Sequence, residues 1–503
     1  MNFADPVELL ARRAQASPDH IAIEEPGRST SYEEVVVLAA RFAAAFRARA
    51  GGQAPRVLIN LPQCAEAYAA MFGALMAGGI YAPNNLSAPA IRQRGVHEAF
   101  EPDAVVAAEG TLDVLGIGPT DRRWVSLSDL PAPLPRRVWA ADDLAYVMFT
   151  SGSTGAPKGV MVAREGLAHF IDWALLAMDV RRTDRWSQHP NLGFDLSVLD
   201  IYGALCGGAT LVPLSRQGDR LTPAAAIRRH KLTIWNSVPS VVDLMLRARQ
   251  VTAQNLETLR LLTFCGEPLL PAHLEAIFAA RPDVVVHNTY GPTEATVSCT
   301  LVRLTEANYR DACRASVALG DPIPGMDVWL AGGESDNEGE VMICGPQVAR
   351  GYWRDPQRTA AAFGEAQRAG RIMPTYRTGD RAARNGRHLF FLERVDRQVK
   401  ILGHRVELGE IDAALRACGA AACTVLWQGE LHAFVEGTPS AVLADLRAAL
   451  AARLPTYAIP AHFHSIAALP RNLNDKADAG ALIAQLVAGA GGVTGAQPEY
   501  QAG

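Results

Sequence analysis

Short apolar runs alternate along most of the chain with longer stretches rich in alanine and leucine. The runs that we expect to form buried strands are residues 57–62, 143–150, 209–214, 232–238 and 283–291. The stretches between them have the length and composition of helices. Strands separated by helices in this way are typical of parallel sheets in an α/β architecture. Ligands bind at the carboxyl ends of such strands, so polar residues that follow each run are the first candidates for a site.

The pattern changes after about residue 396. A short strand and turn, an amphipathic helix over 407–419, a hairpin over 423–437 and a second helix over 441–455 indicate a compact α+β unit. We therefore expect a large N-terminal domain over residues 1–395 and a small C-terminal domain over 396–488. The tail over 489–503 lacks apolar periodicity and is expected to be disordered.

Composition and charge exclude several classes of protein. The chain has 503 residues and a formal net charge of −4, which gives no basic field for binding nucleic acid. The N-terminus lacks the pattern of a signal peptide, and no long uncharged apolar segment predicts a membrane span. The eight cysteines are scattered without a metal-ligand spacing, so we expect reduced thiols, a cytoplasmic location and no structural zinc site.

Residues 146–162 contain a Gly/Ser/Thr loop directly after a predicted buried strand. The strand ends at Thr150, and Lys158 closes the loop with a mobile positive charge. Glycine lets a backbone approach phosphate oxygens, and hydroxyl and amide groups donate hydrogen bonds to them. The spacing is not that of the GxxxxGK[ST] loop, and the alternative is a flexible linker. The loop residues that we expect to contact phosphate are Ser151, Gly152, Ser153, Thr154 and Gly155.

Two further segments carry groups suited to a nucleotide. In residues 288–296, Tyr290 offers an aromatic face for a purine, and Glu294 offers a carboxylate of the kind that Mg²⁺ binds beside ATP phosphates. In residues 376–380, Asp380 is suited to bind two ribose hydroxyls. The alternatives are an exposed loop with one incidental acid and an ordinary turn aspartate.

These segments, in this order, resemble those of the adenylate-forming superfamily of amino-acid adenylation domains, acyl-CoA synthetases and luciferases. The resemblance covers about residues 5 to 485. It implies a large domain of packed, parallel-rich sheets and helices, with a small α+β domain that rotates about a hinge at Asp396. It assigns catalytic roles to Lys476, Glu294 and Thr150, with Glu294 holding Mg²⁺. The residues that it assigns to ATP are Thr150, Ser151, Gly152, Ser153, Thr154, Gly155, Lys158, Gly266, Glu267, Asn288, Thr289, Tyr290, Gly291, Thr293, Asp380 and Arg394.

The closing segment around Lys476 departs from the family's pattern. The family has Asn-Gly-Lys, whereas this chain has Asn474, Asp475 and Lys476. A lysine ammonium there would neutralise charge that builds on the carboxylate and the α-phosphate. The alternative is a degenerate protein that binds adenylate and turns over weakly.

Asp195 separates amino-acid substrates from plain acids. In amino-acid adenylating members of the family, an aspartate at this position receives the substrate's α-ammonium. The alternative is a helix N-cap, since the residues after it read as a helix. The residues that match the family's substrate pocket are Asp195, Leu196, Leu199, Asn236, Thr263, Cys265, Thr289, Val297 and Ser298.

The aliphatic residues of this pocket leave little volume, which favours alanine, with glycine or serine as alternatives. Asn236 and Ser298 could hydrogen-bond a hydroxyl and so keep serine open. The chain resembles D-alanine–carrier protein ligases of cell-envelope alanylation, and also free-standing adenylation enzymes of natural-product pathways. The handedness of the substrate therefore stays open. An acyl-CoA synthetase that uses a small acid is the remaining alternative.

The acceptor that the resemblance implies is the phosphopantetheine thiol of a carrier protein. No segment after Lys476 resembles a carrier domain, so we expect a discrete acyl or peptidyl carrier protein that acts in trans. The segment around Gly403 and His404 is implied to line the path of the pantetheine arm. The predicted function is thus ATP-dependent adenylation of a small amino acid followed by thioester formation.

Overall fold

The computed structural model divides the chain into two compact units. It describes residues 3–133, 143–150, 152, 157–333, 337–368, 370–438, 440–471 and 477–491. The large unit comprises Met1–Thr150, Pro157–Asp396 and Leu402–His404. The small unit comprises Ser151–Ala156, Arg397–Ile401 and Arg405–Gly503. The domain boundary at residue 395/396 and the rotation about Asp396 stay predictions.

A nine-stranded sheet is the largest sheet of the large unit within the described residues. Its central strands pair in parallel, and an antiparallel strand closes each end of that parallel core. The strands, in order across the sheet, are β15 (Asp321–Pro322), β14 (Thr300–Leu304), β13 (Val285–Tyr290), β12 (Leu261–Phe264), β11 (Ile234–Ser237), β9 (Arg185–Gln188), β10 (Thr210–Pro213), β1 (Ile21–Glu25) and β2 (Arg28–Ser31).

A second, six-stranded sheet has at one edge the two strands that flank the predicted phosphate loop. Its strands are, in order, β6 (Trp124–Val125), β5 (Ala104–Ala107), β3 (Arg56–Asn60), β4 (Ile80–Pro83), β7 (Leu144–Thr150) and β8 (Lys158–Ala163). All pairs are parallel except the β7–β8 hairpin. Strands such as β3 are buried on both faces of the sheet. This burial explains why they appear in the sequence as continuous apolar runs.

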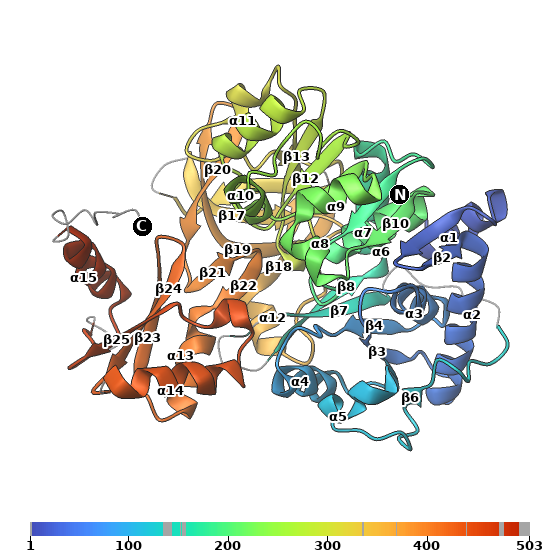
Figure 1. The fold of residues 1–503 in the computed structure, drawn as a ribbon, viewed down its shortest axis with the longest axis horizontal. Coiled ribbons are helices and arrows are strands. Elements are labelled where there is room, and N and C mark those ends of the chain that lie inside the picture. The colour runs from blue at the N-terminus through green and yellow to red at the C-terminus, as the bar shows by residue number, and fades with distance from the viewer. Residues whose placement is uncertain are drawn as a thin grey trace, which may run out of the picture. The chain divides into compact units, whose positions relative to one another are not determined.

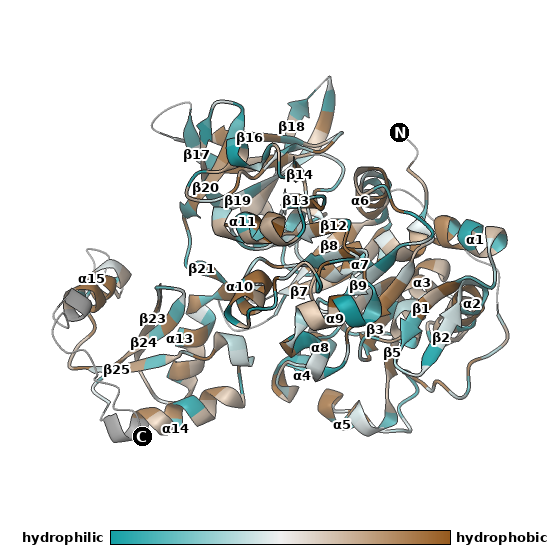
Figure 2. Ribbon diagram, turned by 45° about the horizontal axis from the view of Figure 1, so that its top comes forward, coloured by the Kyte–Doolittle hydropathy of each residue, from teal (hydrophilic) through white to brown (hydrophobic). Residues whose placement is uncertain are grey.

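The helices that cover these sheets follow from their local sequence. Helix α2 (Tyr32–Arg49) begins at a capping box, in which Ser31 and Glu34 satisfy each other's backbone N–H groups. Helix α3 (Ala65–Met76) is buried on almost every side, which its alanine-rich sequence permits, and it packs against α2 (Figure 1). Helix α1 (Pro6–Ala16) is amphipathic instead and shows teal and brown residues side by side (Figure 2).

A five-stranded antiparallel sheet completes the large unit. Strand β19 (Arg371–Asn385) lies at its centre and pairs with three neighbours. The other strands are β16 (Asp327–Ala331), β17 (Glu338–Cys344), β18 (Phe363–Arg368) and β20 (His388–Arg394). The β19–β20 hairpin places Asp380 opposite Arg394.

The small unit has a three-stranded sheet and its own apolar core. Strand β23 (Ala422–Trp427) pairs antiparallel with β24 (Glu430–Glu436), which pairs in parallel with β25 (His462–Ile466). The unit also contains β21 (Gln398–Ile401), all of β22 (His404–Glu407) except its first residue, and the helices α13 (Leu408–Ala417), α14 (Ser440–Ala451) and α15 (Ala479–Gly491). Buried Ile411, Leu415 and Leu450 belong to one core cluster of this unit.

The α/β fold class predicted from the sequence is confirmed. Each of the five apolar runs forms a strand, and the hairpin and two helices of the C-terminal region lie where their patterns place them. Helix α15 includes residues 489–491 of the predicted disordered tail, and the rest of that tail lies outside the described residues. No helix in the described ranges has both the length and the apolar character to cross a bilayer.

Candidate active site

The β7–β8 hairpin holds the ends of the predicted phosphate loop. Thr150 pairs with Lys158 across the hairpin, and the Thr150 hydroxyl donates to the Lys158 carbonyl at 3.3 Å. Gly152 is buried. Ser151, Ser153, Thr154 and Gly155 lie outside the described residues. The hairpin register therefore fixes where the loop leaves the sheet and where it returns.

Lys158 and Glu294 form a buried ion pair. The Lys158 ammonium lies 3.3 Å from Glu294 Oε1, and the two side chains are 8% and 0% exposed. Tyr352 donates to the same oxygen at 2.9 Å, and its ring lies 4.5 Å from the Lys158 nitrogen. Sequence reasoning missed Tyr352, because a tyrosine far along the chain gives no local signal of this contact. Carboxylate oxygens of this kind are the hard donors that Mg²⁺ binds.

Tyr290, Asp380 and Arg394 come from three different strands and meet at one point. The Tyr290 hydroxyl donates to Asp380 Oδ2 at 2.6 Å, and Arg394 pairs with Asp380 Oδ1. Burial, with the nearby Asp380 carboxylate, raises the pKa of Tyr290 well above its ordinary value. Arg394 also binds both oxygens of Asp396 at 2.7 Å. The predicted ribose ligand and hinge residue thus share one guanidinium.

The other residues assigned to ATP have identifiable structural partners. Glu267 accepts from the backbone N–H of Ser240 at 3.0 Å, and the Asn288 amide donates to the Ala318 carbonyl at 2.8 Å. Gly266 has a φ of +94°, which favours glycine. A Cβ on Gly291 would lie 2.6 Å from the Ser298 Cα, so the backbone packs too closely there for any side chain. Thr293 is buried at the start of a short 3-10 helix.

Asp195 lies at the N-cap position of α7 (Leu196–Gly207) and is 9% exposed. Its side chain makes no capping hydrogen bond to that helix. The alternative prediction of a helix N-cap is therefore right about the position of Asp195. Its carboxylate, however, does not cap the helix. The helix itself is buried along its whole length.

A buried polar network lies next to the first turn of α7. The Asn236 amide donates to the Leu196 carbonyl at 3.3 Å and to Asp200 Oδ1 at 2.9 Å. Trp186 donates to the same Asp200 oxygen at 3.0 Å. Asn236 Oδ1 is buried and has no hydrogen-bond partner among the described residues. Sequence reasoning missed Asp200, although it lies five positions after Asp195 on the same helix.

The hydroxyl groups of the predicted pocket are largely engaged with one another. Ser298 Oγ lies 3.0 Å from Thr289 Oγ1 and 3.5 Å from Cys265 Sγ. Thr289 in turn donates to the Phe264 carbonyl at 3.1 Å. Thr263 Oγ1 is buried without a hydrogen-bond partner among the described residues. Leu196, Leu199 and Val297 are buried as well.

Residues Leu402–His404 group with the large unit. The Gly403 N–H donates to Glu267, and the His404 ring meets Phe194 edge-on at 4.9 Å. Burial, with the charge of Arg92, lowers the pKa of His404 to about 4. Lys476, the predicted catalytic lysine, lies outside the described residues.

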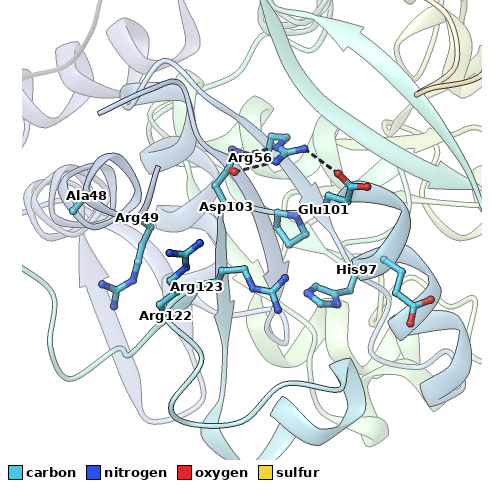
Figure 3. Close-up of a pocket in the computed structure, with 10 residues that line it drawn as sticks. Ala48, Arg49, Arg56, His97, Glu101, Asp103, Arg122 and Arg123 are labelled. Atoms are coloured by element: carbon cyan, nitrogen blue, oxygen red, sulfur yellow. Dashed lines mark hydrogen bonds and ion pairs between the residues drawn. The ribbon is translucent and has the colours of Figure 1, made fainter. Parts of the chain in front are cut away.

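Several arginines line a hollow whose lining includes none of the predicted site residues (Figure 3). Arg56 pairs there with Asp103 at 3.0 Å and with Glu101 at 3.8 Å. Arg123 pairs with Asp121 at 2.7 Å. Because these carboxylates compensate two of its guanidinium groups, the hollow has a weaker anion-binding character than its arginine content suggests.

Known proteins resemble the chain along almost its whole length. An L-proline–(L-prolyl-carrier protein) ligase of Pseudomonas fluorescens is 34% identical over 95% of this chain and 100% of its own length. A D-alanine–D-alanyl carrier protein ligase of Lactiplantibacillus plantarum is 30% identical over 79% of this chain and 80% of its own.

A solved structure and a family match agree with these relatives. The Vibrio cholerae adenylation domain AlmE, in complex with glycyl-adenosine-5'-phosphate, superimposes with a TM-score of 0.82 at 27% identity, covering 97% of this chain and 98% of that one. Residues 10–353 match the family described as AMP-binding enzyme. The protein is therefore a member of the AMP-binding enzyme family.

Proposed function

We propose that the protein activates a small amino acid with ATP and transfers it to the phosphopantetheine thiol of a carrier protein. The observation that carries this proposal is the position of Asp195. Its side chain is 9% exposed, it makes no capping hydrogen bond to α7, and the other residues assigned to the pocket are buried as well. In the amino-acid adenylating enzymes that the chain resembles, an aspartate at this position receives the substrate's α-ammonium, and such a charge-assisted bond is stronger than a neutral one.

The neighbouring side chains favour a small, uncharged substrate. Of the residues assigned to the pocket, Asp195 alone carries a charge. Ser298 and Thr289 already share a hydrogen bond. They therefore offer fewer hydrogen bonds to a substrate hydroxyl than the sequence suggested. The unpartnered Asn236 Oδ1 instead favours a hydrogen-bond donor on the ligand, since a buried acceptor without a partner costs about 1–3 kcal/mol.

Alanine, of either hand, is our first candidate substrate. Glycine is the next, because the superimposed AlmE structure contains a glycyl adenylate. Proline is a further candidate, since the relative named an L-proline ligase is matched over its entire length. These side chains differ by only a few methylene groups, and one methylene changes discrimination by only about 1–3 kcal/mol. We therefore expect overlapping use of small amino acids.

The residues present fit ATP and Mg²⁺. Asp380 and Tyr290 would bind the ribose and adenine, and Thr150 with the loop that follows would bind the phosphates. The Glu294 carboxylate would hold Mg²⁺, because it is a hard oxygen donor and carries a charge. A bound Mg²⁺ ion supplies neutralisation of phosphate charge. Lys158, beside Glu294, gives the same region a second cation.

The reaction needs no nucleophile from the protein. A carboxylate oxygen of the amino acid attacks the α-phosphorus of ATP. The bond from that phosphorus to the oxygen shared with the β-phosphate breaks, and pyrophosphate leaves. The thiolate of the carrier then attacks the carbonyl carbon of the aminoacyl adenylate, and AMP leaves with the oxygen that joined it to the acyl group. The protein contributes by aligning the reactants and by stabilising developing charge, a role in which Lys476 would act on the α-phosphate.

The test is amino-acid-dependent ATP–pyrophosphate exchange with both enantiomers of alanine, with glycine, L-serine, L-proline and acetate. Asp195→Asn preserves the size of the side chain and removes its charge. We expect it to lower kcat/KM for the preferred amino acid by about 10- to 100-fold, the equivalent of one charge-assisted hydrogen bond. Glu33→Gln, which removes an exposed carboxylate from α2, is the control and should have no effect.

Three other outcomes of these assays would each contradict one part of the proposal. Exchange with acetate and none with amino acids would identify an acyl-CoA synthetase. Binding of ATP without exchange for any acid would indicate a degenerate adenylate-binding protein. Unchanged exchange in Asp195→Asn would remove the role assigned to that carboxylate.

A further inference from the structure

Four metal-ligating side chains gather on the three-stranded sheet of the small unit. Strands β24 and β25 pair in parallel with His432 opposite His462 and Phe434 opposite His464. Side chains two positions apart along a strand share a face, so His462 and His464 point the same way. Glu430 begins β24, two residues before His432. The register of the sheet therefore brings three imidazoles and a carboxylate together.

The distances between these groups are those of a compact ligand set. One possible ligand atom each from Glu430, His432 and His462 lies within 4.8 Å of the other two. His462 Nε2 lies 2.7 Å from Glu430 Oε2, and the rings of His432 and His462 stack with centroids 4.4 Å apart. His464 Nε2 shares a hydrogen bond with His432 Nδ1 at 3.0 Å.

We propose that Glu430, His432 and His462 bind a first-row divalent transition-metal ion, for which Zn²⁺ is the best match. Two imidazoles and one carboxylate are among the donor sets that Zn²⁺ takes, with a fourth position left for water or another ligand. Imidazole also suits Cu²⁺ and Ni²⁺, whereas Mg²⁺ and Ca²⁺ prefer oxygen donors. The site is thus chemically different from the carboxylate of Glu294.

The surroundings shield one side of the cluster and leave the other accessible. His432 is 5% exposed, and the edge of Trp427 contacts its ring with centroids 5.5 Å apart. Glu430 and His462 are exposed, so an ion has a path to them. A metal site gains affinity from apolar groups that shield its ligands, and it needs exposed ligands for the ion to enter.

The sequence predicts no structural zinc site, and the metal site proposed here differs from that prediction. That expectation came from scattered cysteines, whereas the ligands proposed here are histidines and a glutamate from two separate strands. Residues 430–432 and 462 lie too far apart in sequence to give a recognisable ligand spacing. Only the parallel pairing of β24 with β25 brings them together.

The experiment titrates Zn²⁺ into the full chain, prepared without an affinity tag and stripped with EDTA, by calorimetry in the absence of nucleotide and Mg²⁺. We expect one Zn²⁺ per chain in the wild type. His462→Gln and Glu430→Gln should each weaken that binding by at least about tenfold. His388→Gln, which changes a half-buried histidine of β20, is the control and should bind as the wild type does.

A thermal unfolding series separates loss of the site from loss of the fold. In EDTA, His462→Gln should unfold at the wild-type temperature, because His462 is exposed. At one fixed Zn²⁺ concentration, the unfolding temperature of the wild type and of His388→Gln should rise equally, and that of His462→Gln should rise less. Absence of saturable binding, or equal Zn²⁺ affinity in the wild type and His462→Gln, would overturn the proposal. The proposed function does not depend on either result, since pyrophosphate exchange is assayed with Mg²⁺ alone.

Discussion

At the scale of single residues, Asp200 departs from the ordinary behaviour of an aspartate. Its side chain is fully buried, and Trp186 and Asn236 both donate to one of its oxygens. Burial raises the pKa of Asp200 well above its ordinary value, despite these hydrogen bonds. Between the pKa values of the unfolded and folded states, the folded protein therefore holds a proton that the unfolded chain has lost. Stability falls as the pH rises through that window.

Replacing Asp200 with asparagine removes this titration while it keeps the shape of the side chain. We expect the free energy of unfolding of Asp200→Asn, measured relative to wild type, to increase as the pH rises from about 4 towards neutrality. The measurement is urea denaturation of both proteins over that pH range. A difference that stays constant with pH would show that Asp200 remains charged in the folded state.

At the scale of elements, α7 depends on one glycine for its approach to the nine-stranded sheet. A Cβ on Gly203 would lie 2.6 Å from Cη2 and 3.0 Å from Cζ3 of Trp186. That indole is fully buried on β9 and is held by its hydrogen bond to Asp200. The ring therefore has little freedom to move away from an added methyl group.

Gly203→Ala should destabilise the protein by about 1–3 kcal/mol, the usual cost of adding atoms to a packed core. Gly218→Ala is the matched control, because Gly218 is also helical, in α8 (Gln217–Leu221), and nothing lies within 4 Å of its added Cβ. We expect the control to be neutral or to gain up to about 1 kcal/mol from helix propensity. Chemical denaturation of both variants measures the difference, and equal stabilities would refute the packing argument.

The helices and strands could be predicted from the sequence more fully than the contacts between side chains of different elements. The run 283–291 became β13 at Val285–Tyr290, because burial on both faces leaves a local signature. The contact of Tyr352 with Glu294, and the network of Asp200, left no such signature. They depend on which elements the tertiary fold brings together, and an isolated tyrosine or aspartate reads the same wherever it packs. The site residues assigned by resemblance could be predicted only because they lie within short sequence motifs.

At the scale of the whole molecule, each unit has its own apolar core. Leu415 of α13 is fully buried in the core of the small unit. Leucine-to-alanine changes in such positions typically cost about 2–5 kcal/mol. A core of its own gives the small unit the means to unfold separately from the large one.

We expect Leu415→Ala to lower one of two transitions in calorimetry of the full chain and to leave the other in place. The shifted transition belongs to the small unit. Val487→Ala, at an exposed position of α15 in the same unit, is the control and should move neither transition. A single transition that shifts as a whole in Leu415→Ala would mean that the two units unfold cooperatively.

The pairing of β1 with β10 has a consequence for how the chain is made. Ile23 pairs with Leu211, so β1 is synthesised roughly 190 residues before its parallel neighbour β10. At typical synthesis rates of about 5–20 residues per second, the N-terminal hairpin waits roughly 10 to 40 s for that neighbour. During that interval, β1 exposes an unpaired edge that other nascent chains or chaperones can occupy. Slowing translation before the codon for Leu211 would lengthen this exposure, and so would couple the yield of folded protein to the speed of the ribosome.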